Sequence, residues 1–312
     1  MTHDANDSAP IGEYALLLVL AALWGGSFTL IKVALESYPP MTIVSTRVMI
    51  GGLILMAIAM MRRDAFPTTG RRWGELLIQG TLQGGLPFYL ITWAEKHVDS
   101  SVAGIINSTP PMFVFLITVF LLRTAKFDGL KLLGILFGML GVGIIAVSRS
   151  EGLGDSSTLA ILAVLAASCS YATGAIFGRR FGQQSAFITG GVSLFLAGLI
   201  TTPAALLLEN PLALSPALTP TLALLALSLF STALASLIFF RLLKTLGSLA
   251  TTSNAYLRAL FSMLLGALFL GEDLGVQILA ATLCIFMGVF LVTGQFRTRV
   301  YDRLFAKRTE NA

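Results

Sequence analysis

The sequence predicts an all-α integral membrane protein with ten transmembrane helices in two inverted five-helix repeats around a central cavity. Of its 312 residues, 55% are hydrophobic and only 12% are charged, whereas soluble domains have about 25% charged residues. The charges occur in short islands between apolar stretches of about 20 residues, the length that crosses a hydrocarbon core of about 30 Å. An internal repeat near half the chain length completes the argument.

The apolar runs between charge islands predict the helices. They cover residues 14–35, 41–61, 74–95, 99–122, 129–148, 157–178, 187–207, 218–240, 248–270 and 275–295. The chain then divides into an N-terminal tail at 1–13, a first repeat at 14–150, a second repeat at 151–295 and a basic tail at 296–312.

The basic residues predict the orientation. If the connection after the second span is cytoplasmic, sixteen Lys and Arg residues lie on the cytoplasmic side, against three outside: Lys32, Lys96 and Arg149. The positive-inside bias therefore predicts two cytoplasmic termini. The net charge of +5 and the basic tail favour contact with the anionic headgroups of the lipid bilayer, and we expect no nucleic-acid partner.

The residues that could form a catalytic or metal centre are scarce. The two histidines, His3 and His97, lie outside the predicted spans, and the two cysteines, Cys169 and Cys284, lie in apolar runs where packing is the favoured role. An intramembrane enzyme needs a Ser/His pair, an Asp pair or a His-rich metal set. We therefore expect no enzyme, no metal and no cofactor.

The internal repeat rests on two echoes. "VLAA" occurs at 19–22 and again at 164–167, and a shift of 148 residues pairs Lys96 with Lys244, Ser100 with Ser248, Phe113 with Phe261, Leu116 with Leu264 and Leu122 with Leu270. Five spans per half make the second half enter the membrane from the opposite side. Inverted repeats of this kind occur in many secondary transporters, with a substrate site near the midplane.

Four segments carry a family resemblance: "ALWGGSF", "VSTRVMIGGLI", "GIINSTPPMFVFLITVFLL" and "RALFSMLLGALFLGEDLGVQ". In this order they resemble the EamA-type branch of the drug/metabolite transporter superfamily. Two positions depart from the family pattern. Its acidic residue after the fourth span is matched by Glu272 in the second half but by Thr124 in the first, and its proline is matched by Ala259, preceded by Arg258.

Within that family the chain is most similar to YddG-type bacterial exporters of aromatic and other amino acids. The resemblance implies a multi-pass protein of the bacterial inner membrane that exports or facilitates the movement of small amphipathic metabolites by alternating access. Aromatic and apolar amino acids are the favoured substrates. A nucleoside, a sugar or a drug is the alternative, and a scaffold or receptor without transport is a further one.

Prolines mark the first candidate site. Pro110 and Pro111 cannot donate hydrogen bonds to the carbonyls of Ile106 and Asn107, so two acceptors are freed near the midplane. Bare carbonyls are costly in lipid, so this face should meet protein, water or ligand. The polar side chains of Asn107 and Thr109 are substrate-binding candidates here, and a packing kink is the alternative.

A polar stripe in the third span gives further candidates. Gln79 and Gln83 are four residues apart and share a helix face, and Tyr89 follows Pro87, which could open this helix. Hydrogen bonding between helices is the alternative for the glutamines.

Arg258 is the charge nearest the centre of a span, four residues after Asn254. Charges at that depth mark functional sites by default, and a guanidinium fork suits a substrate α-carboxylate. Both residues are candidates, with the alternative that Arg258 binds the carbonyls of a broken helix. Arg47 is nearer a span end, and we expect it to reach the interface or tether a loop.

The first span supplies the last candidates. Trp24, Ser27 and Phe28 share one helix face, which we expect to line the cavity, while Gly25 and Gly26 seat neighbouring helices. The repeat places Tyr171 of the sixth span at the position of Gly26, so Tyr171 is also a substrate-binding candidate, with core packing as the alternative.

The carboxylates indicate the energy source. Glu13, Glu75, Glu95 and Glu272 all lie near span ends, whereas a buried carboxylate is the usual proton carrier. We therefore expect gradient-driven transport without tight proton coupling. One chain supplies both halves, so a monomer is sufficient for the substrate site.

Overall fold

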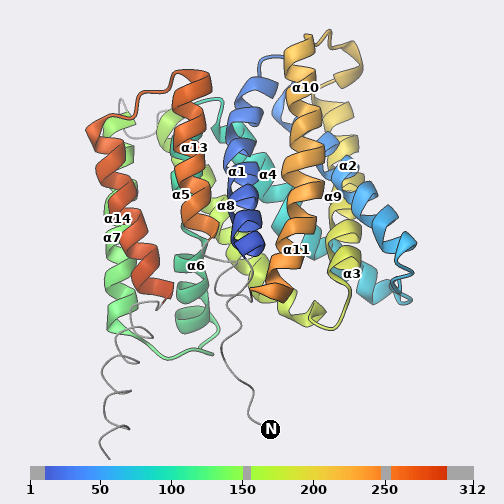
Figure 1. Ribbon diagram of the computed structural model, residues 1–312, viewed down its shortest axis with the longest axis horizontal. Helices are drawn as coiled ribbons and strands as arrows, with labels where there is room; N and C mark the ends of the chain where they lie inside the picture. The colour runs from blue at the N-terminus through green and yellow to red at the C-terminus, as the bar shows by residue number, and fades with distance from the viewer. Residues whose placement is uncertain (1–10, 150–155, 247–253, 294–312) are drawn as a thin grey trace, which may run out of the picture.

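The computed structural model describes residues 11–149, 156–246 and 254–293. All regular structure in these ranges is helical (Figure 1). The predicted basic tail at 296–312 and most of the N-terminal tail lie outside the described residues, as do the first residues of the predicted span at 248–270.

The first half of the described chain contains α1 (Ile11–Ala34), α2 (Pro40–Met61), α3 (Gly70–Gly80), η1 (Thr81–Gly85), α4 (Leu86–Ala94), α5 (Ser100–Ile106), α6 (Pro110–Leu116), η2 (Ile117–Leu121) and α7 (Gly129–Arg149). The second half contains α8 (Ser156–Gly178), η3 (Arg179–Phe181), α9 (Ala186–Leu208), η4 (Pro211–Ala213), α10 (Leu218–Ala226), η5 (Leu227–Leu234), α11 (Ala235–Thr245), α13 (Asn254–Leu270) and α14 (Val276–Thr293). Segments η1, η2 and η5 are π-helical, and η3 and η4 are 3-10 turns.

Seven helical runs among the described residues are long and apolar enough to cross a membrane. Two shorter apolar helices, Leu257–Leu270 and Val276–Val292, accompany them. The predicted third span at 74–95 is covered by α3, η1 and α4. Helix α3 begins earlier, at Gly70, and its first turns contain the charged residues Arg71, Arg72 and Glu75. The all-helical membrane fold is therefore shown, whereas the count of ten transmembrane helices stays a prediction.

Large apolar side chains cover the outside of the bundle. Leu121 is 75% exposed, Val147 83% and Leu207 85%. A water-soluble protein rarely carries apolar surface on this scale, because such surface drives association. Hydrocarbon is the solvent that suits this surface.

Helices of the first half of the chain pack against helices of the second half. Helix α2 packs on α9 and α7 packs on α14, while α1 packs on α13 and α8 packs on α4 and α6. In Figure 1, α7 and α14 form one end of the bundle, α2, α3 and α9 the other, and α1 and α8 lie between them. The first and sixth predicted spans thus make corresponding contacts with the opposite half, as an inverted repeat requires.

Glycines allow the halves to approach at backbone distance. A Cβ atom added to Gly25 of α1 would lie 2.5 Å from Phe261 Cβ and 2.7 Å from the carbonyl oxygen of Arg258 on α13. A Cβ on Gly52 of α2 would lie 2.5 Å from the backbone nitrogen of Phe195 on α9. The predicted seating of a neighbouring helix at Gly25 is confirmed, and it is the usual role of small residues between membrane helices.

Carboxylates connect α2 and α9 at both ends. The Glu209 carboxylate, after α9, accepts the backbone N–H of Met41 at 2.9 Å and that of Thr42 at 2.7 Å, at the start of α2. At the other end, the Ser185 hydroxyl before α9 donates to the Asp64 carboxylate after α2. Each acid lies at the N-terminus of the partner helix, where negative charge is favourable.

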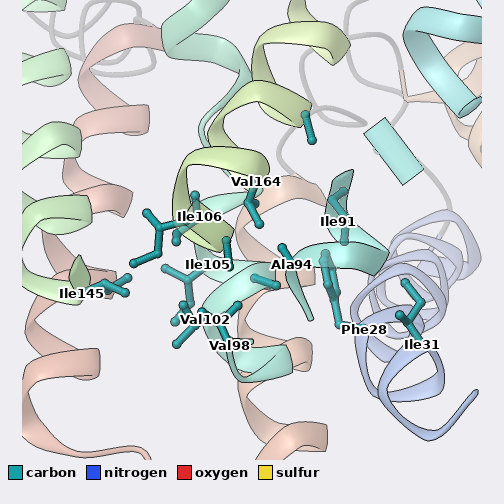
Figure 2. Packing of buried hydrophobic residues seen from close by; sticks show 14 of the residues in the cluster. Phe28, Ile31, Ile91, Ala94, Val98, Val102, Ile105, Ile106, Ile145 and Val164 are labelled. Carbon is teal, nitrogen blue, oxygen red and sulfur yellow. The ribbon is translucent and has the colours of Figure 1, made fainter. Parts of the chain in front are cut away.

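The main apolar core draws on both halves of the chain. Figure 2 shows part of this core, with Phe28 of α1, Ile91 of α4, Ile106 of α5, Ile145 of α7 and Val164 of α8. The break between α5 and α6 begins directly after Ile106, so the core holds this break in a fixed position inside the bundle.

Candidate functional site

The break between α5 and α6 forms where the prolines predict it. The Ile106 carbonyl accepts the backbone N–H of Thr109 at 3.1 Å and its hydroxyl at 2.8 Å, in the tight turn before Pro110. The Asn107 carbonyl accepts Arg258 Nη2 of α13 at 2.6 Å. This face of the helix meets protein, as expected, and Arg258 takes the alternative role of binding a carbonyl of the broken helix.

Two polar side-chain atoms remain without a partner at this break. Arg258 Nε and Asn107 Oδ1 are both buried and make no hydrogen bond to the described residues. Asn107 is only 2% exposed. Buried polar groups are almost always hydrogen-bonded, so a free donor and a free acceptor on two residues in contact indicate a place where a polar ligand can bind.

Tyr171 of α8 connects the third and sixth predicted spans to the break. Its carbonyl accepts Gln83 Nε2 of η1 at 2.9 Å, and its side chain lies near the guanidinium groups of Arg258 and Arg47. Gly174, one turn later, leaves room for Gln83, because a Cβ there would lie 2.6 Å from Gln83 Nε2.

The expectation that Arg47 reaches the interface or tethers a loop is wrong. Its side chain points inward: Arg47 is 6% exposed, its Nε donates to Thr232 Oγ1 at 2.7 Å, and its guanidinium lies 3.9 Å from the centroid of the Phe88 ring. The guanidinium is held by η5 and α4, which pack on α2. The general association of intramembrane charge with function could have identified it.

These residues define the central polar cluster: Arg47, Gln83, Asn107, Tyr171 and Arg258. Its members come from five of the predicted spans and from both halves of the chain. Thr109 adjoins it but uses its hydroxyl within the turn.

The first-span candidates lie in packed surroundings. The Trp24 ring stacks at a tilt on Phe239 of α11, with centroids 5.4 Å apart. Ser27 donates to the Trp24 carbonyl at 2.7 Å, and Phe28 belongs to the main core. Trp24 and Phe28 thus contact different apolar clusters, and substrate contact by these three residues stays a prediction.

The remaining candidates, Asn254, Gln79 and Tyr89, have separate surroundings. Asn254 donates to the Leu17 carbonyl at 3.2 Å. Gln79 lies beside Gly178, with Oε1 buried and unpartnered among the described residues. Tyr89 lines a cavity of about 180 Å³ between α2, α4 and α9.

A larger groove, of about 980 Å³, lies between α7 and the start of α14. It is lined mainly by apolar residues of α7, including Met139 and Val147, both outside the central polar cluster. Neither of these two cavities is lined by a residue of the central polar cluster.

Comparison with known proteins identifies the family. The model of the EamA-like transporter family matches residues 12–147 and 158–294, one match in each half of the chain. The duplicated match fits the inverted repeat.

Three relatives are similar over nearly their whole length. The inner membrane transporter YedA of Escherichia coli K12 is 27% identical over 286 residues, which cover 91% of each chain. The transporter YvbV of Bacillus subtilis 168 is 27% identical and covers 89% of this chain and 90% of its own. Protein PecM of Dickeya dadantii 3937 is 24% identical and covers 86% and 88%.

A solved crystal structure has the same fold. It superposes with a TM-score of 0.66 over 92% of this chain and 98% of its own, at 18% sequence identity. The fold, the apolar exterior and the two family matches agree. The chain therefore belongs to the EamA-like transporter family and is a multi-pass membrane transporter.

Proposed function

We propose that this transporter exports, or facilitates the movement of, small amphipathic metabolites, with aromatic and apolar amino acids as its substrates. The proposed mechanism is alternating access around the central polar cluster, with Arg258 as the receiver of the substrate carboxylate. The proposal implies two cytoplasmic termini in a bacterial inner membrane, which is the location named for YedA and the one that the resemblance to YddG-type exporters implies.

One observation carries the proposal: Arg258 is a partly buried cation whose Nε is fully buried, and it has no carboxylate partner among the described residues. Its Nη2 donates to the neutral Asn107 carbonyl, and its Nε has no partner in the described part of the chain. A buried charge is costly unless it is paired. The planar guanidinium can bind a carboxylate through two parallel hydrogen bonds, so a substrate carboxylate would complete the site.

Asn107 can serve the other end of a zwitterion. Its unpartnered Oδ1 is a hydrogen-bond acceptor. It suits the ammonium group of the substrate, because an ammonium group only donates hydrogen bonds. The Asn107 backbone carbonyl already holds Arg258. A donor for the carboxylate and an acceptor for the ammonium group are therefore on neighbouring residues, as an amino acid requires.

The apolar surroundings support a substrate with an apolar side chain. Tyr171 packs against the main core, and Phe88 lies against Arg47. Binding sites for small molecules combine mainly apolar walls with a few polar groups that fix orientation. Aromatic and aliphatic amino acids have this combination of features.

Counterflow in proteoliposomes tests the proposal. Purified protein is reconstituted with an unlabelled amino acid inside, and uptake of the same labelled solute is followed, with nucleosides, sugars and cationic drugs as parallel substrates. We expect counterflow with aromatic and apolar amino acids. Counterflow with another solute class alone, or with none, would overturn the substrate assignment.

A further inference from the structure

Glu95 is a buried carboxylate that the proposed solute site does not use. It follows the last residue of α4, near a predicted span end, where a charged side chain is expected to be hydrated. The structure instead gives it 0% exposure, and neither carboxylate oxygen has a hydrogen-bond partner among the described residues. An unpaired ionised carboxylate in such a site is very costly.

The charged groups around Glu95 are engaged with other partners. From α1, Lys32 Nζ donates to the backbone carbonyls of Glu95 at 2.6 Å and Val98 at 2.8 Å. After α13, the Glu272 carboxylate accepts the backbone N–H groups of Ser100 and Ser101.

From α2, Arg47 donates to Thr232. Lys32, Glu272 and Arg47 all interact electrostatically with Glu95, but no ion pair forms between the Glu95 carboxylate and any described residue. The Glu95 carboxylate therefore has two cations and one other carboxylate nearby, but none of them contacts it. A proton is the smallest ligand that neutralises it.

We propose that Glu95 is a proton-binding site and that its protonation is coupled to solute binding at the central polar cluster. The step is the addition of a proton to the Glu95 carboxylate to give the neutral carboxyl group, with no other bond made or broken. The coupling half of the proposal rests on the proposed function, because it requires a solute that carries a carboxylate.

Arg47 connects the two sites. It belongs to the central polar cluster, and its guanidinium interacts electrostatically with Glu95. An ionised Glu95 lowers the positive potential that a solute carboxylate meets, and protonation removes that negative charge. Proton and solute therefore favour each other's binding, and this coupling is reciprocal.

The inference revises the energetic expectation from sequence. Gradient-driven transport without tight proton coupling was expected because the carboxylates lie near span ends, where water is within reach. The position of Glu95 in the chain is as expected, but its burial is not. Depth along the helix and burial inside the bundle are separate quantities, and only the structure supplies the second.

Two measurements on the purified full-length protein test the inference. The first is infrared difference spectroscopy across a pH titration, which detects the carbonyl stretch of a protonated carboxyl group, on wild type and Glu95→Gln. The second is proton uptake on addition of a transported amino acid in weakly buffered detergent solution, together with solute affinity at several pH values. Glu36→Gln is the matched control, because Glu36 is exposed in the turn after α1.

We expect a protonated-carboxyl band that is lost in Glu95→Gln and kept in Glu36→Gln. Wild type should take up protons when solute binds, and its affinity should change by at least about fivefold across the titration of Glu95, the lower end of typical coupling between sites. Glu95→Gln should take up no protons when solute binds. Its solute affinity should change by less than about twofold over the same pH range.

The contrary results are distinct from failure of the proposed function. Absence of the band in wild type would overturn the proton site whatever the substrate is. Solute binding without proton uptake by wild type would overturn the coupling, even if Glu95→Gln does not fold. Absence of any amino-acid binding would instead overturn the proposed substrate, and the band would still decide whether Glu95 binds a proton.

Discussion

Arg258 of α13 donates a hydrogen bond of 2.6 Å from Nη2 to the Asn107 carbonyl at the break between α5 and α6. This contact joins the two halves of the chain at a point where Pro110 and Pro111 prevent ordinary helix bonding. Arg258 Nε and Asn107 Oδ1, on the same two residues, have no hydrogen-bond partner among the described residues. The same pair thus closes the helix break and forms the proposed solute site.

Replacement of Arg258 should affect transport more than folding. In Arg258→Met the carboxylate receiver is lost, and we expect solute affinity to fall by about 10- to 100-fold, the range of a charge-assisted hydrogen bond. Arg258→Lys keeps the charge without the planar fork and should fall between Met and wild type. Binding isotherms on variants that elute as wild type in size-exclusion chromatography measure this, and unchanged affinity in Arg258→Met would contradict the assignment.

The two adjacent glycines of α1 should respond differently to alanine. A Cβ on Gly25 meets the backbone of α13, whereas a Cβ on Gly26 meets Leu265 Cδ1 at 3.2 Å, the movable end of a side chain. We expect Gly25→Ala to lower the free energy of unfolding by about 1 to 3 kcal/mol through overpacking. Gly26→Ala should have a much smaller effect on the thermal midpoint in detergent, and equal effects would count against this packing.

The fold was largely predictable because its determinants are local in sequence. The length of each apolar run, the charge islands and the break at Pro110 and Pro111 all follow from the residues themselves. The seating role of Gly25 was also predictable, since glycine inside a membrane helix commonly allows close approach. The third predicted span is not among the seven long apolar runs, and the first turns of α3 contain Arg71, Arg72 and Glu75.

Arg47 should contribute to stability through two contacts. Its hydrogen bond to Thr232 and its stacking on Phe88 are both made in a buried environment. We expect Arg47→Ala to lower the free energy of unfolding by about 2 to 4 kcal/mol. Thr232→Val removes the acceptor of Arg47 Nε and the hydrogen bond that the same hydroxyl donates to the Leu227 carbonyl, and it should lower the free energy of unfolding by about 1 to 2 kcal/mol. Chemical denaturation in mixed micelles ranks the two, and a larger effect of Thr232→Val would be contrary to the structure.

The orientation of side chains around the site was not predictable, because it depends on which helices meet. Arg47 lies near a span end, yet η5 supplies Thr232 and α4 supplies Phe88 to hold it inside. Glu95 also lies near a span end, and it is buried because segments from elsewhere in the chain pack around it. The sequence places Trp24 and Phe28 on one helix face, but in the structure Trp24 packs on α11 and Phe28 packs in the main core. Contacts between distant segments decide these cases.

The carboxylate between α9 and α2 should stabilise the pairing of the two halves. Glu209 accepts the Met41 and Thr42 backbone N–H groups and the Thr42 hydroxyl. We expect Glu209→Gln to lower the free energy of unfolding by about 0.5 to 2 kcal/mol, the range for loss of a helix cap. The exposed Glu36→Gln should leave the thermal midpoint unchanged. A Glu209→Gln midpoint equal to that of Glu36→Gln would show that the cap adds nothing.

The most direct test of the account compares an amino acid with its carboxamide in wild type and in Arg258→Gln. If Arg258 receives the carboxylate, wild type should bind the acid at least about tenfold more tightly than the amide, the scale of one charge-assisted hydrogen bond. Arg258→Gln should bind both with similar affinity. The same preference for the acid in both proteins would contradict the central claim, because the carboxylate would then be recognised elsewhere.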